Sequence, residues 1–575
     1  MAKQWIMPFP SPRRMEAARR WRVSPLVAQL LLNRGISPDD SGTSFLAPQL
    51  SELHPPALLP GAKSAAVILA RAVKDRRKIV IYGDYDVDGV TGSSILWHML
   101  QHAGGDVLFY VPHRVEEGYG VNAEAVRRLV NDGAQLIVTV DCGITAVDAA
   151  NVLREAGVPL VVTDHHRAQA ELPHAAAIVH PGLDGSYPNP DLCGAGVAFK
   201  LAWSLAQELC GTEKVTPELR TLLMSLLPLA ALGTIADVVP LCGENRVLAR
   251  AGLQALPQTK MPGLCALMES AGLTGQAVSG YDVGFKLAPR INAAGRMGHA
   301  RLAVEMLTRA DLPRAQEIAL YLEEHNRSRQ AAERRILKQV REVIDKGNLA
   351  GDARRAIVAG GDGWHAGVIG IVASRVVEQF HRPVVLIALT AEEGQGSARS
   401  IANFDLSAAL GGCAEHLTAF GGHAMAAGLR ITRKNVPAFA EAFVALANQR
   451  LTAEDLKPKL RLDAEVTPAD MDMTTALAII DLGPFGVGNP RPKFATEWVE
   501  LAAEPRCVGK TGEHLQATFR HGGTQIKGIG FGLAGCLEDL KQHRRCRVAF
   551  EPIINEFNGR RSVEMQMIDL QFPTP

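Results

Sequence analysis

Short apolar runs alternate with helical segments between residues 78 and 163, and this alternation constrains the fold more than any other feature of the sequence. The predicted helices are 92–102, 124–131 and 146–156, and the predicted strands that they separate are 78–82, 107–111, 136–140 and 160–163. Strands joined by helices in this way form βαβ units, whose strands lie parallel in one sheet. We therefore predict an α/β fold built on a parallel sheet.

Acidic side chains stand directly after three of these strands. In chain order they are Asp84, Asp86 and Asp88, which we place in one loop, then Asp141, and then the triplet Asp164, His165 and His166. A further acid, Asp237, follows an apolar helical stretch. In an open parallel sheet, ligands bind just beyond the carboxyl ends of the strands. We expect these side chains to converge on one crevice.

Several carboxylates in one crevice repel one another and take up protons unless a cation is present. Carboxylates with imidazole suit Mn²⁺ better than Mg²⁺, although Mg²⁺ is possible, and the nine cysteines contain no C-x-x-C pair that would favour zinc. Two ions about 3.5–4 Å apart would hold a phosphate and activate a water for in-line attack. The cluster therefore predicts a two-metal phosphoesterase.

Each piece of the pattern has a simpler interpretation when taken alone. An Asp after a strand is more often a helix cap or a turn residue. The run D-x-D-x-D-G also resembles the start of an EF-hand loop, but its twelfth position is Ile95 where that loop needs Glu. The three motifs together favour the metal site.

These motifs resemble those of the DHH phosphoesterase superfamily, which takes its name from the triplet found here at 164–166. The resemblance implies that Asp86 and Asp88 each bind one metal and that Asp141 bridges both. It assigns His165 and Asp237 to the second metal. Asp84 and His166 are implied to orient the ligands, and together with the bridging Asp141 they form the predicted catalytic group. Small members carry a metal-binding His where this chain has Tyr82, so the first ion is expected to have fewer protein ligands.

Glycine-rich motifs between residues 289 and 428 resemble the DHHA1 domain, which binds phosphates and nucleic acids. Glycine lets a backbone approach a phosphate closely, and helix N-termini favour anions. For Trp364 and His365, which open a predicted helix, a core Trp with a capping His is an equally good interpretation. The resemblance implies these substrate-binding residues: Arg290, Asn292, Arg296, His365, Ser397, Arg399, Gly421, Gly422 and His423.

The sequence divides into five predicted segments. They are an irregular N-terminal segment with one short helix near 24–35 (1–60), a parallel-sheet DHH domain (61–310), a charged connecting helix (311–348), a smaller α/β DHHA1 domain with strands near 355–359 and 384–389 (349–455) and a C-terminal β domain (456–575). In the last segment the predicted strands are 461–466, 514–519, 525–531, 547–553 and 563–570, with hairpin turns at 521–523 and 558–559. These strands suit a small OB-like barrel, and a sandwich would have a similar pattern.

Motif order and length resemble the superfamily's single-strand-specific exonucleases. The resemblance implies 5′-to-3′ degradation of single-stranded DNA to mononucleotides in recombination and repair, with a helicase and a single-strand-binding protein as possible partners. Three alternatives stay open: a small DHH-DHHA1 phosphoesterase acting on short oligonucleotides or nucleotide phosphates, a pyrophosphatase, and a non-catalytic single-strand-binding scaffold. The C-terminal domain argues against the first, the glycine-rich second domain and Tyr82 against the second, and the complete acid set against the scaffold.

Composition adds little to this choice. The net charge of +1 neither supports nor excludes a nucleic-acid partner. The sequence has no run of about 18 uninterrupted apolar residues and no hydrophobic signal-peptide core at its start, so we predict a cytoplasmic protein without a membrane segment.

Overall fold

The chain is described by a computed structural model that covers residues 3–112, 117, 120–297 and 300–573, without the side chains of residues 40, 296 and 297. It divides into two compact units. The smaller unit consists of Met1–Ile6 and Glu323–Leu460, and the larger unit consists of Met7–Leu322 and Arg461–Pro575. Both units contain α/β structure, which confirms the predicted fold class.

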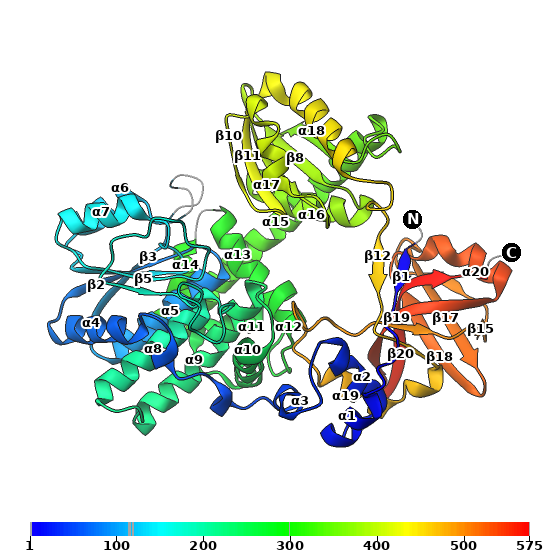
Figure 1. Cartoon of the computed structure of the whole chain (residues 1–575), viewed down its shortest axis with the longest axis horizontal. Coiled ribbons are helices and arrows are strands. Elements are labelled where there is room, and N and C mark those ends of the chain that lie inside the picture. Colours follow the sequence, from blue (N-terminus) through cyan, green and yellow to red (C-terminus); the bar gives the residue numbers. More distant parts are fainter. Residues whose placement is uncertain (1–2, 113–116, 118–119, 298–299, 574–575) are drawn as a thin grey trace. The chain divides into compact units, whose positions relative to one another are not determined.

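A parallel sheet with the strand order β3-β2-β4-β5-β6 forms the centre of the larger unit (Figure 1). The first four strands along the chain lie within one residue of their predicted bounds, and β6 was not predicted. The strand order reverses at β2, because β3 lies on one side of it and β4 on the other. The strands are β2 (Lys78–Gly83), β3 (Asp106–Tyr110), β4 (Leu136–Val140), β5 (Leu160–Thr163) and β6 (Ala177–Val179).

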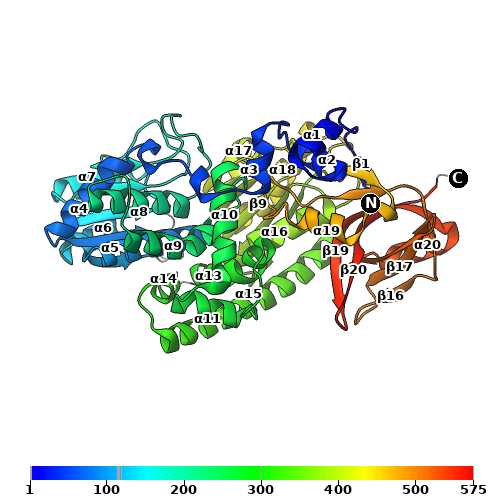
Figure 2. The same ribbon diagram turned by 90° about the horizontal axis from the view of Figure 1, so that it is seen from below.

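Helices cover both faces of this sheet (Figures 1 and 2). One face carries α4 (Ala62–Lys74), α5 (Val87–His102), α8 (Gly194–Cys210) and α9 (Pro217–Ala236), and the other carries α6 (Ala123–Asn131) and α7 (Val147–Glu155). Successive side chains of a strand point to opposite faces of the sheet. Ile79 and Ile81 of β2 pack against the first group of helices, and Val80 and Tyr82 pack against the second. Strands β2, β4 and β5 are therefore buried on both sides, whereas Leu108 of the edge strand β3 is 45% exposed.

Further helices extend the first layer. They are α10 (Gly243–Ala255), α11 (Pro262–Ser270), α12 (Gly280–Asp282), α13 (Ala288–Met297) and α14 (Ala300–Thr308), with a π-helical turn at Val283–Leu287. By length and composition, α9 is apolar enough to cross a membrane, and so is the bent pair Leu50–Leu58 with Ala62–Lys74 if it is counted as one span. Since 61% of the α9 window is buried inside the structure, α9 packs as a core helix.

The N-terminal segment is more ordered than predicted. It forms β1 (Gln4–Ile6), α1 (Arg14–Trp21), α2 (Pro25–Asn33) and α3 (Asp40–Leu46). Trp21, Leu30 and Leu31 are buried in the same core as the C-terminal strands. The predicted short helix is α2, whereas β1, α1 and α3 were not predicted. Helices α1 and α2 are stabilised by residues more than 400 positions away in the chain, as in the hydrogen bond from Asn33 of α2 to the carbonyl of Asp463.

The C-terminal strands close into a barrel. β15 (Val499–Leu501), β17 (His514–His521), β18 (Thr524–Gly530), β20 (Arg560–Gln571) and β19 (Arg545–Phe557) pair in a ring in that order. This confirms the barrel over the sandwich. Both predicted hairpin turns are present, and at the second Asn558 and Gly559 have φ of 51° and 73°, as a type I′ turn requires.

The remaining C-terminal elements are short. The predicted strand 461–466 is split into β12 (Lys459–Arg461), which pairs with β1 in the smaller unit, and β13 (Ala464–Val466). The sequence patterns missed β14 (Phe494–Thr496), β15, β16 (Arg506–Val508), α19 (Met473–Ile480) and α20 (Leu537–His543). Strands of three residues carry too little alternation to be recognised.

The smaller unit contains a second sheet in the order β10-β11-β9-β8-β7. The predicted strands near 355–359 and 384–389 are β7 (Ile357–Asp362) and β8 (Val384–Leu389). β9 (Glu393–Arg399), β10 (Ala419–Gly422) and β11 (Ala426–Thr432) were not predicted, because glycine has low strand propensity. Helices α16 (Ala366–Phe380), α17 (Leu406–Gly411) and α18 (Val436–Arg450) complete the unit, and α15 (Leu312–Lys346), the predicted long helix, runs from one unit into the other.

A buried ion pair ties the N-terminal segment to the helical layer of the larger unit. The side chains of Lys200 and Glu244 are in contact and fully buried. Lys200 also donates to the carbonyl of His54, and Glu244 accepts from the amide of His54 at 3.0 Å and from the hydroxyl of Tyr187 at 2.7 Å. Removing either charge would leave the other buried without its partner.

We expect Glu244→Ala to destabilise the protein by about 3–5 kcal/mol, because it leaves the Lys200 ammonium buried and unpaired. The measurement is the urea concentration at half-unfolding, followed by circular dichroism. Exposed Glu213→Ala is the matched control and should leave the midpoint unchanged. An unchanged midpoint in Glu244→Ala would show that this pair does not stabilise the fold.

Candidate metal centre

Main-chain hydrogen bonds fix three acidic residues at the carboxyl edge of the parallel sheet. In each case the amide of the first residue after a strand donates to the carbonyl of the last residue of the neighbouring strand. The pairs are Asp84 with Val140 at 3.1 Å, Asp141 with Thr163 at 3.0 Å, and Asp164 with Val179 at 3.2 Å. The predicted convergence of strand-end acids is therefore confirmed, at the point where the strand order reverses.

Asp141 lies in a strained and crowded position. Its φ is 62°, a left-handed conformation that costs a non-glycine residue about 1–2 kcal/mol. Gly194, the first residue of α8, packs directly on it: a Cβ at Gly194 would lie 2.7 Å from both Cβ and Oδ1 of Asp141. The conformation turns the carboxylate into the crevice, and glycine is needed to let α8 begin there.

The prediction that Asp88 lies in a loop was wrong. Asp86 is the N-cap of α5 and accepts from the amides of Asp88 at 2.9 Å and Gly89 at 3.1 Å, so the helix begins at Val87 rather than at residue 92. Asp86 thus has the capping role that was the simpler interpretation of a strand-end Asp. Because Asp86 is the N-cap, Asp88 lies in the first turn of α5.

The carboxylate of Asp88 meets the N-terminus of α8. Its Oδ2 accepts from the amide of Gly194 at 2.6 Å, and its Oδ1 accepts from Ala195 at 2.8 Å. A helix N-terminus stabilises negative charge. Gly233 of α9 also packs closely here, since a Cβ on it would lie 2.5 Å from Oδ1 of Asp88. Asp88 is therefore held rigidly from two helices.

His165 lies at the centre of the acids. Its Nε2 is 3.1 Å from Asp141 Oδ1, 3.6 Å from Asp237 Oδ2 and 3.8 Å from Asp88 Oδ2. In each of three groups the candidate ligand atoms lie within 4.8 Å of one another; the groups are Asp84 with Asp86 and Asp141, Asp88 with His165 and Asp237, and Asp141 with His165 and His166. All seven residues predicted for the catalytic and metal site are in these groups.

Asp164 positions the two histidines. Its Oδ1 accepts from the amides of His165 at 2.7 Å and His166 at 3.1 Å and contacts His166 Nδ1 at 2.8 Å, and its Oδ2 accepts from the amide of Ile144 at 2.9 Å. His180 Nε2 contacts the carbonyl of His166 at 2.8 Å. The sequence analysis assigned no role to Asp164, although it opens the D-H-H triplet, and no sequence signal identified His180.

Burial and mutual repulsion raise the pKa values of the acids in the crevice. Burial, and then the charge of Asp88, raise the pKa of Asp86. Burial, and then the charges of Asp88, Asp86 and Asp84, raise the pKa of Asp141 well above its usual range. Burial and Asp88 raise the pKa of Asp237 to about 8. These carboxylates are thus costly to ionise together without a cation.

The histidines respond in opposite directions. Burial lowers the pKa of His165, which favours the neutral ring that a metal requires. Burial also opposes a charge on His166, but the hydrogen bond and the negative charge of Asp164 outweigh it and raise the His166 pKa to about 9. For Asp164, burial is likewise outweighed by the hydrogen bond from His166, and its pKa is lowered. His166 and Asp164 therefore form an ion pair beside a neutral His165.

Two buried atoms at the centre indicate what the site holds. Asp141 Oδ1 and His165 Nε2 face each other, yet neither has a hydrogen-bond partner within the part of the chain that the structure describes. A divalent cation would satisfy both atoms and neutralise the surrounding carboxylates. Oxygen donors with one imidazole and no thiolate suit Mn²⁺ or Mg²⁺. The residues present therefore fit a divalent metal.

Tyr82 takes no part in this cluster. Its hydroxyl donates to the carbonyl of Gly120 at 3.2 Å and accepts from the amide of Asn122 at 3.3 Å. Its ring packs 5.1 Å from that of Tyr110. Where small members of the superfamily have a histidine, this chain therefore has a core side chain on the other face of the sheet.

The predicted substrate residues of α13 lie close to the acid-bearing loop. A Cβ at Gly295 would lie 2.6 Å from the carbonyl of Tyr85, so α13 passes directly over this loop. Arg290 donates to the carbonyls of Lys286 at 2.6 Å and Ser270 at 3.2 Å, and Asn292 is half-buried. Arg296 lies in the same helix, but its side chain is outside the described residues.

The predicted substrate residues of the smaller unit come together at one end of its sheet. Across the strands Gly421 pairs with Gly428, and Gly428 with Ser397. Gly422 is the last residue of β10, and His423 is exposed in the turn that follows. Gly396, Gly421 and Gly428 line a shallow hollow of about 300 Å³.

Helix α16 joins this region through its first turns. A Cβ at Gly370 would lie 2.9 Å from Ser397 Oγ and 3.0 Å from Arg399 Nη2. Arg399 also donates to Ser397 Oγ at 3.2 Å. His365 is the N-cap of α16, where its Nδ1 accepts from the amide of Gly367 at 3.1 Å, and Trp364 is buried. The capping interpretation of His365 is therefore confirmed, while contact with a substrate stays a prediction.

Known protein families match three parts of the chain. The DHH family N-terminal domain matches residues 78–230, the DHHA1 domain residues 353–451, and the RecJ OB domain residues 462–569. The third match agrees with the closed barrel described above.

Individual relatives extend this match to nearly the whole chain. The single-stranded-DNA-specific exonuclease RecJ of Bacillus subtilis is 38% identical over 98% of this chain and 70% of its own length. Among solved structures, RecJ of Thermus thermophilus in complex with Mn²⁺ is 33% identical, with a TM-score of 0.83 over 100% of this chain and 80% of the other. The Mg²⁺ complex of that protein gives a TM-score of 0.79 at 32% identity, over 100% and 79%. The chain therefore belongs to the RecJ family.

Proposed function

We propose that the chain is a metal-dependent exonuclease that hydrolyses single-stranded DNA from its 5′ end to mononucleotides, in DNA recombination and repair. The observation that carries this proposal is the buried cluster in which His165 lies within 3.8 Å of three carboxylates and two central atoms lack hydrogen bonds. Its relatives, named as single-stranded-DNA-specific exonucleases, support the substrate.

We assign two ions to this cluster, with Mn²⁺ preferred and Mg²⁺ possible. Asp84 and Asp86 with Asp141 would hold one ion, and Asp88, His165 and Asp237 the other, with Asp141 shared, because these are the groups whose donor atoms converge. The ions would supply a clamp on the scissile phosphate and an activated water. His166, paired with Asp164, keeps a protonated ring at neutral pH beside the cluster.

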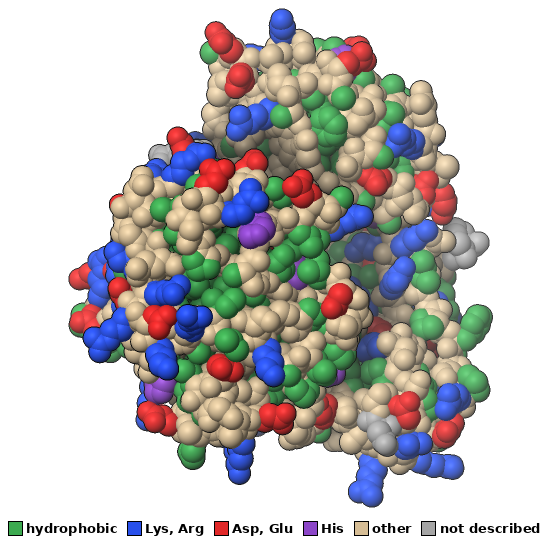
Figure 3. All heavy atoms as spheres, turned by 60° about the vertical axis from the view of Figure 1, so that its left-hand side comes forward, with side chains coloured by type: hydrophobic (Ala, Val, Ile, Leu, Met, Phe, Trp, Pro, Cys, Tyr) green, Lys and Arg blue, Asp and Glu red, His purple; other side chains and the backbone are tan. Residues whose placement is uncertain are grey.

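The smaller unit would hold the nucleotide backbone. The exposed residues Gly421 and Gly422 would let a phosphate approach the main chain, and the side chains of His423, Arg399 and Ser397 and the first turn of α16 would provide donors for its oxygens. On α13, Arg290, Asn292 and Arg296 would contact the substrate from the larger unit. Surface charge gives no further guidance, since Lys and Arg are interspersed with Asp and Glu on the face drawn in Figure 3.

The barrel would bind the single strand beyond the cleavage site. Three aromatic side chains that the sequence could not identify as stacking positions are exposed on it: Trp498, Phe531 and Phe557. Arg545 lies over the Trp498 ring at 5.4 Å, which places a cation beside an exposed ring. Aromatic rings with neighbouring cations are the usual platform for stacked bases.

The cellular setting follows from this activity. We propose a cytoplasmic enzyme, with the domain limits predicted from the sequence, that receives its single strand from a helicase and a single-strand-binding protein. A scaffold without activity is disfavoured, because every predicted metal ligand is present in the cluster.

Hydrolysis of 5′-labelled single-stranded DNA with Mn²⁺ tests the proposal, with duplex DNA, RNA, a dinucleotide and pyrophosphate alongside. We expect labelled mononucleotide as the first product, from the single strand only. Activity confined to the dinucleotide or to pyrophosphate would assign the chain to the small phosphoesterases instead. Binding without hydrolysis would indicate a scaffold.

We expect Asp141→Ala to lower kcat by about 10³-fold or more, because it removes the ligand shared by both ions, while single-strand binding persists. The control is Asp132→Ala, which removes an exposed acid from the C-terminal end of α6. Wild-type turnover in Asp141→Ala would contradict the assignment of the cluster.

We expect His423→Ala to raise KM for single-stranded DNA about 10-fold, the loss of one charge-assisted hydrogen bond, with metal binding unchanged. His416→Ala, a partly exposed histidine of the same unit, should have little effect. Loss of metal from the His423 variant, measured by calorimetric titration with Mn²⁺, would refute the assignment to substrate binding.

We expect Trp498→Ala to weaken binding of a long single strand by about 1–3 kcal/mol, the contribution of one stacked base. Hydrolysis of a dinucleotide should be unaffected. Phe9→Ala removes another exposed ring, 93% accessible, from the N-terminal segment and serves as control in the same fluorescence-anisotropy titration. Equal affinities for all three proteins would make the Trp498 ring irrelevant to binding.

A further inference from the structure

Arg246, in the first turns of α10, is one of the largest fully buried side chains of the protein, with 1% of its surface exposed. Its Nε donates to the carbonyl of Phe45 at 3.0 Å, and the Phe45 ring covers the guanidinium at 3.8 Å. Nη1 and Nη2 are also buried, and neither has a hydrogen-bond acceptor in the described part of the chain. One edge of a buried cation is therefore unsatisfied.

The charges around Arg246 do not compensate it. No carboxylate among the described residues lies within 4.0 Å of its guanidinium. Burial, and then the neighbouring charges of Arg250 and Arg34, lower the pKa of Arg246 to about 10. It therefore stays protonated at neutral pH.

A cavity of about 400 Å³ adjoins this side chain. It is lined by segments far apart in the sequence, and its polar lining includes Arg34, Ser41, Ser44, Cys242 and Gly243 together with Arg246. Helix α10, 13 residues long, begins at Gly243 without a side-chain cap, so its N-terminal amides lie at the same cavity. Glu52 is the one carboxylate in the lining, and its Oε1 accepts from the amide of Gln49 at 3.2 Å.

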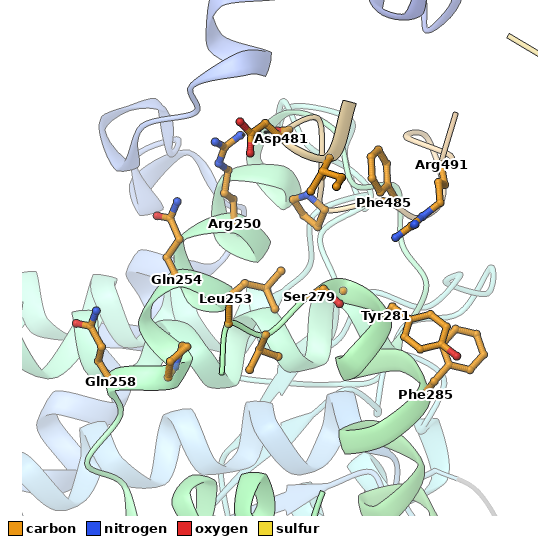
Figure 4. A pocket seen from close by; sticks show the side chains of 17 residues that line it. Arg250, Leu253, Gln254, Gln258, Ser279, Tyr281, Phe285, Asp481, Phe485 and Arg491 are labelled. Carbon is orange, nitrogen blue, oxygen red and sulfur yellow. Dashed lines mark hydrogen bonds between the residues drawn. The ribbon is translucent and has the colours of Figure 1, made fainter. Parts of the chain in front are cut away.

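A neighbouring hollow shows the contrast. It measures about 670 Å³ and lies farther along α10, lined by Arg250, the Tyr281–Phe285 pair and Phe485 (Figure 4). Its arginines are satisfied: Arg250 donates to the carbonyls of Leu46 at 2.9 Å and Asp481 at 3.3 Å, and Arg491 lies 3.8 Å from Glu551. Of these two cavities, only the smaller one has a buried arginine, Arg246, whose Nη atoms lack hydrogen-bond acceptors among the described residues.

We propose that this cavity binds a small phosphate-type anion, either inorganic phosphate or the phosphate of a mononucleotide, held by Arg246, the Ser44 hydroxyl and the first turn of α10. Arginine and a helix N-terminus are the donors that recognise phosphate best. Because both Nη atoms are enclosed, binding requires the surrounding side chains to move apart so that the anion reaches them. It would join α3, α10 and the segment at Gly488 that leads into the barrel.

The test is the melting temperature in EDTA, with sodium phosphate, dAMP or sodium chloride at equal ionic strength. We expect phosphate to raise the wild-type Tm by about 2–4 °C relative to chloride. A rise with dAMP as well would show that the cavity accepts a phosphomonoester, and a rise with phosphate alone that it takes the free anion. No rise with either would overturn the proposal.

Variants locate the effect. Arg246→Met should lose the phosphate response, while Arg220→Met, an exposed arginine of α9, and His423→Ala in the smaller unit should keep it. Ser44→Asp supplies an internal carboxylate: it should have a raised Tm without phosphate and no further response, which tests the site even where Arg246→Met fails to fold. A full phosphate response in Ser44→Asp would contradict the proposal.

Discussion

The hydrogen bonds that extend the parallel sheet by one residue past each strand end are the constraint on which the metal centre depends. They fix Asp84, Asp141 and Asp164 at adjacent positions along one edge, so the carboxylates cannot move apart to relieve their repulsion. Burial then makes that repulsion costly, as the raised pKa values of Asp86 and Asp141 show. A divalent cation resolves the conflict, so the sheet geometry itself creates the metal site.

Further contacts, from helix α8 and from Asp164, fix the other side chains of the crevice. The N-terminus of α8 donates two amides to Asp88 and packs its first glycine on Asp141, and Asp164 fixes both histidines through main-chain and ring contacts. Asp88, Asp141 and both histidines are thus each held in position by a neighbouring residue. Sites built this way hold their geometry better than sites on free loops.

The convergence of the strand-end acids could be predicted from the sequence, because the carboxyl ends of parallel strands meet at one edge of the sheet. The position of Asp88 in a helix was not predicted, because the start of α5 depends on the cap at Asp86 and not on the spacing of apolar residues. Helix α1 and the strands β9–β11 were missed for another reason: α1 is stabilised by a core shared with the distant C-terminal strands, and β9–β11 are rich in glycine. The roles of Asp164 and His180 depend on individual hydrogen bonds, which no spacing of residues reveals.

Anomalous diffraction at the manganese edge, from crystals of the full chain soaked in Mn²⁺, tests the central claim most directly. We expect two peaks in the crevice at the carboxyl edge of β2 and β4, one beside Asp86 and one beside His165, with Asp141 between them. A single peak would remove the two-ion assignment. No peak in the crevice at saturating Mn²⁺ would contradict the claim that these carboxylates form a metal centre.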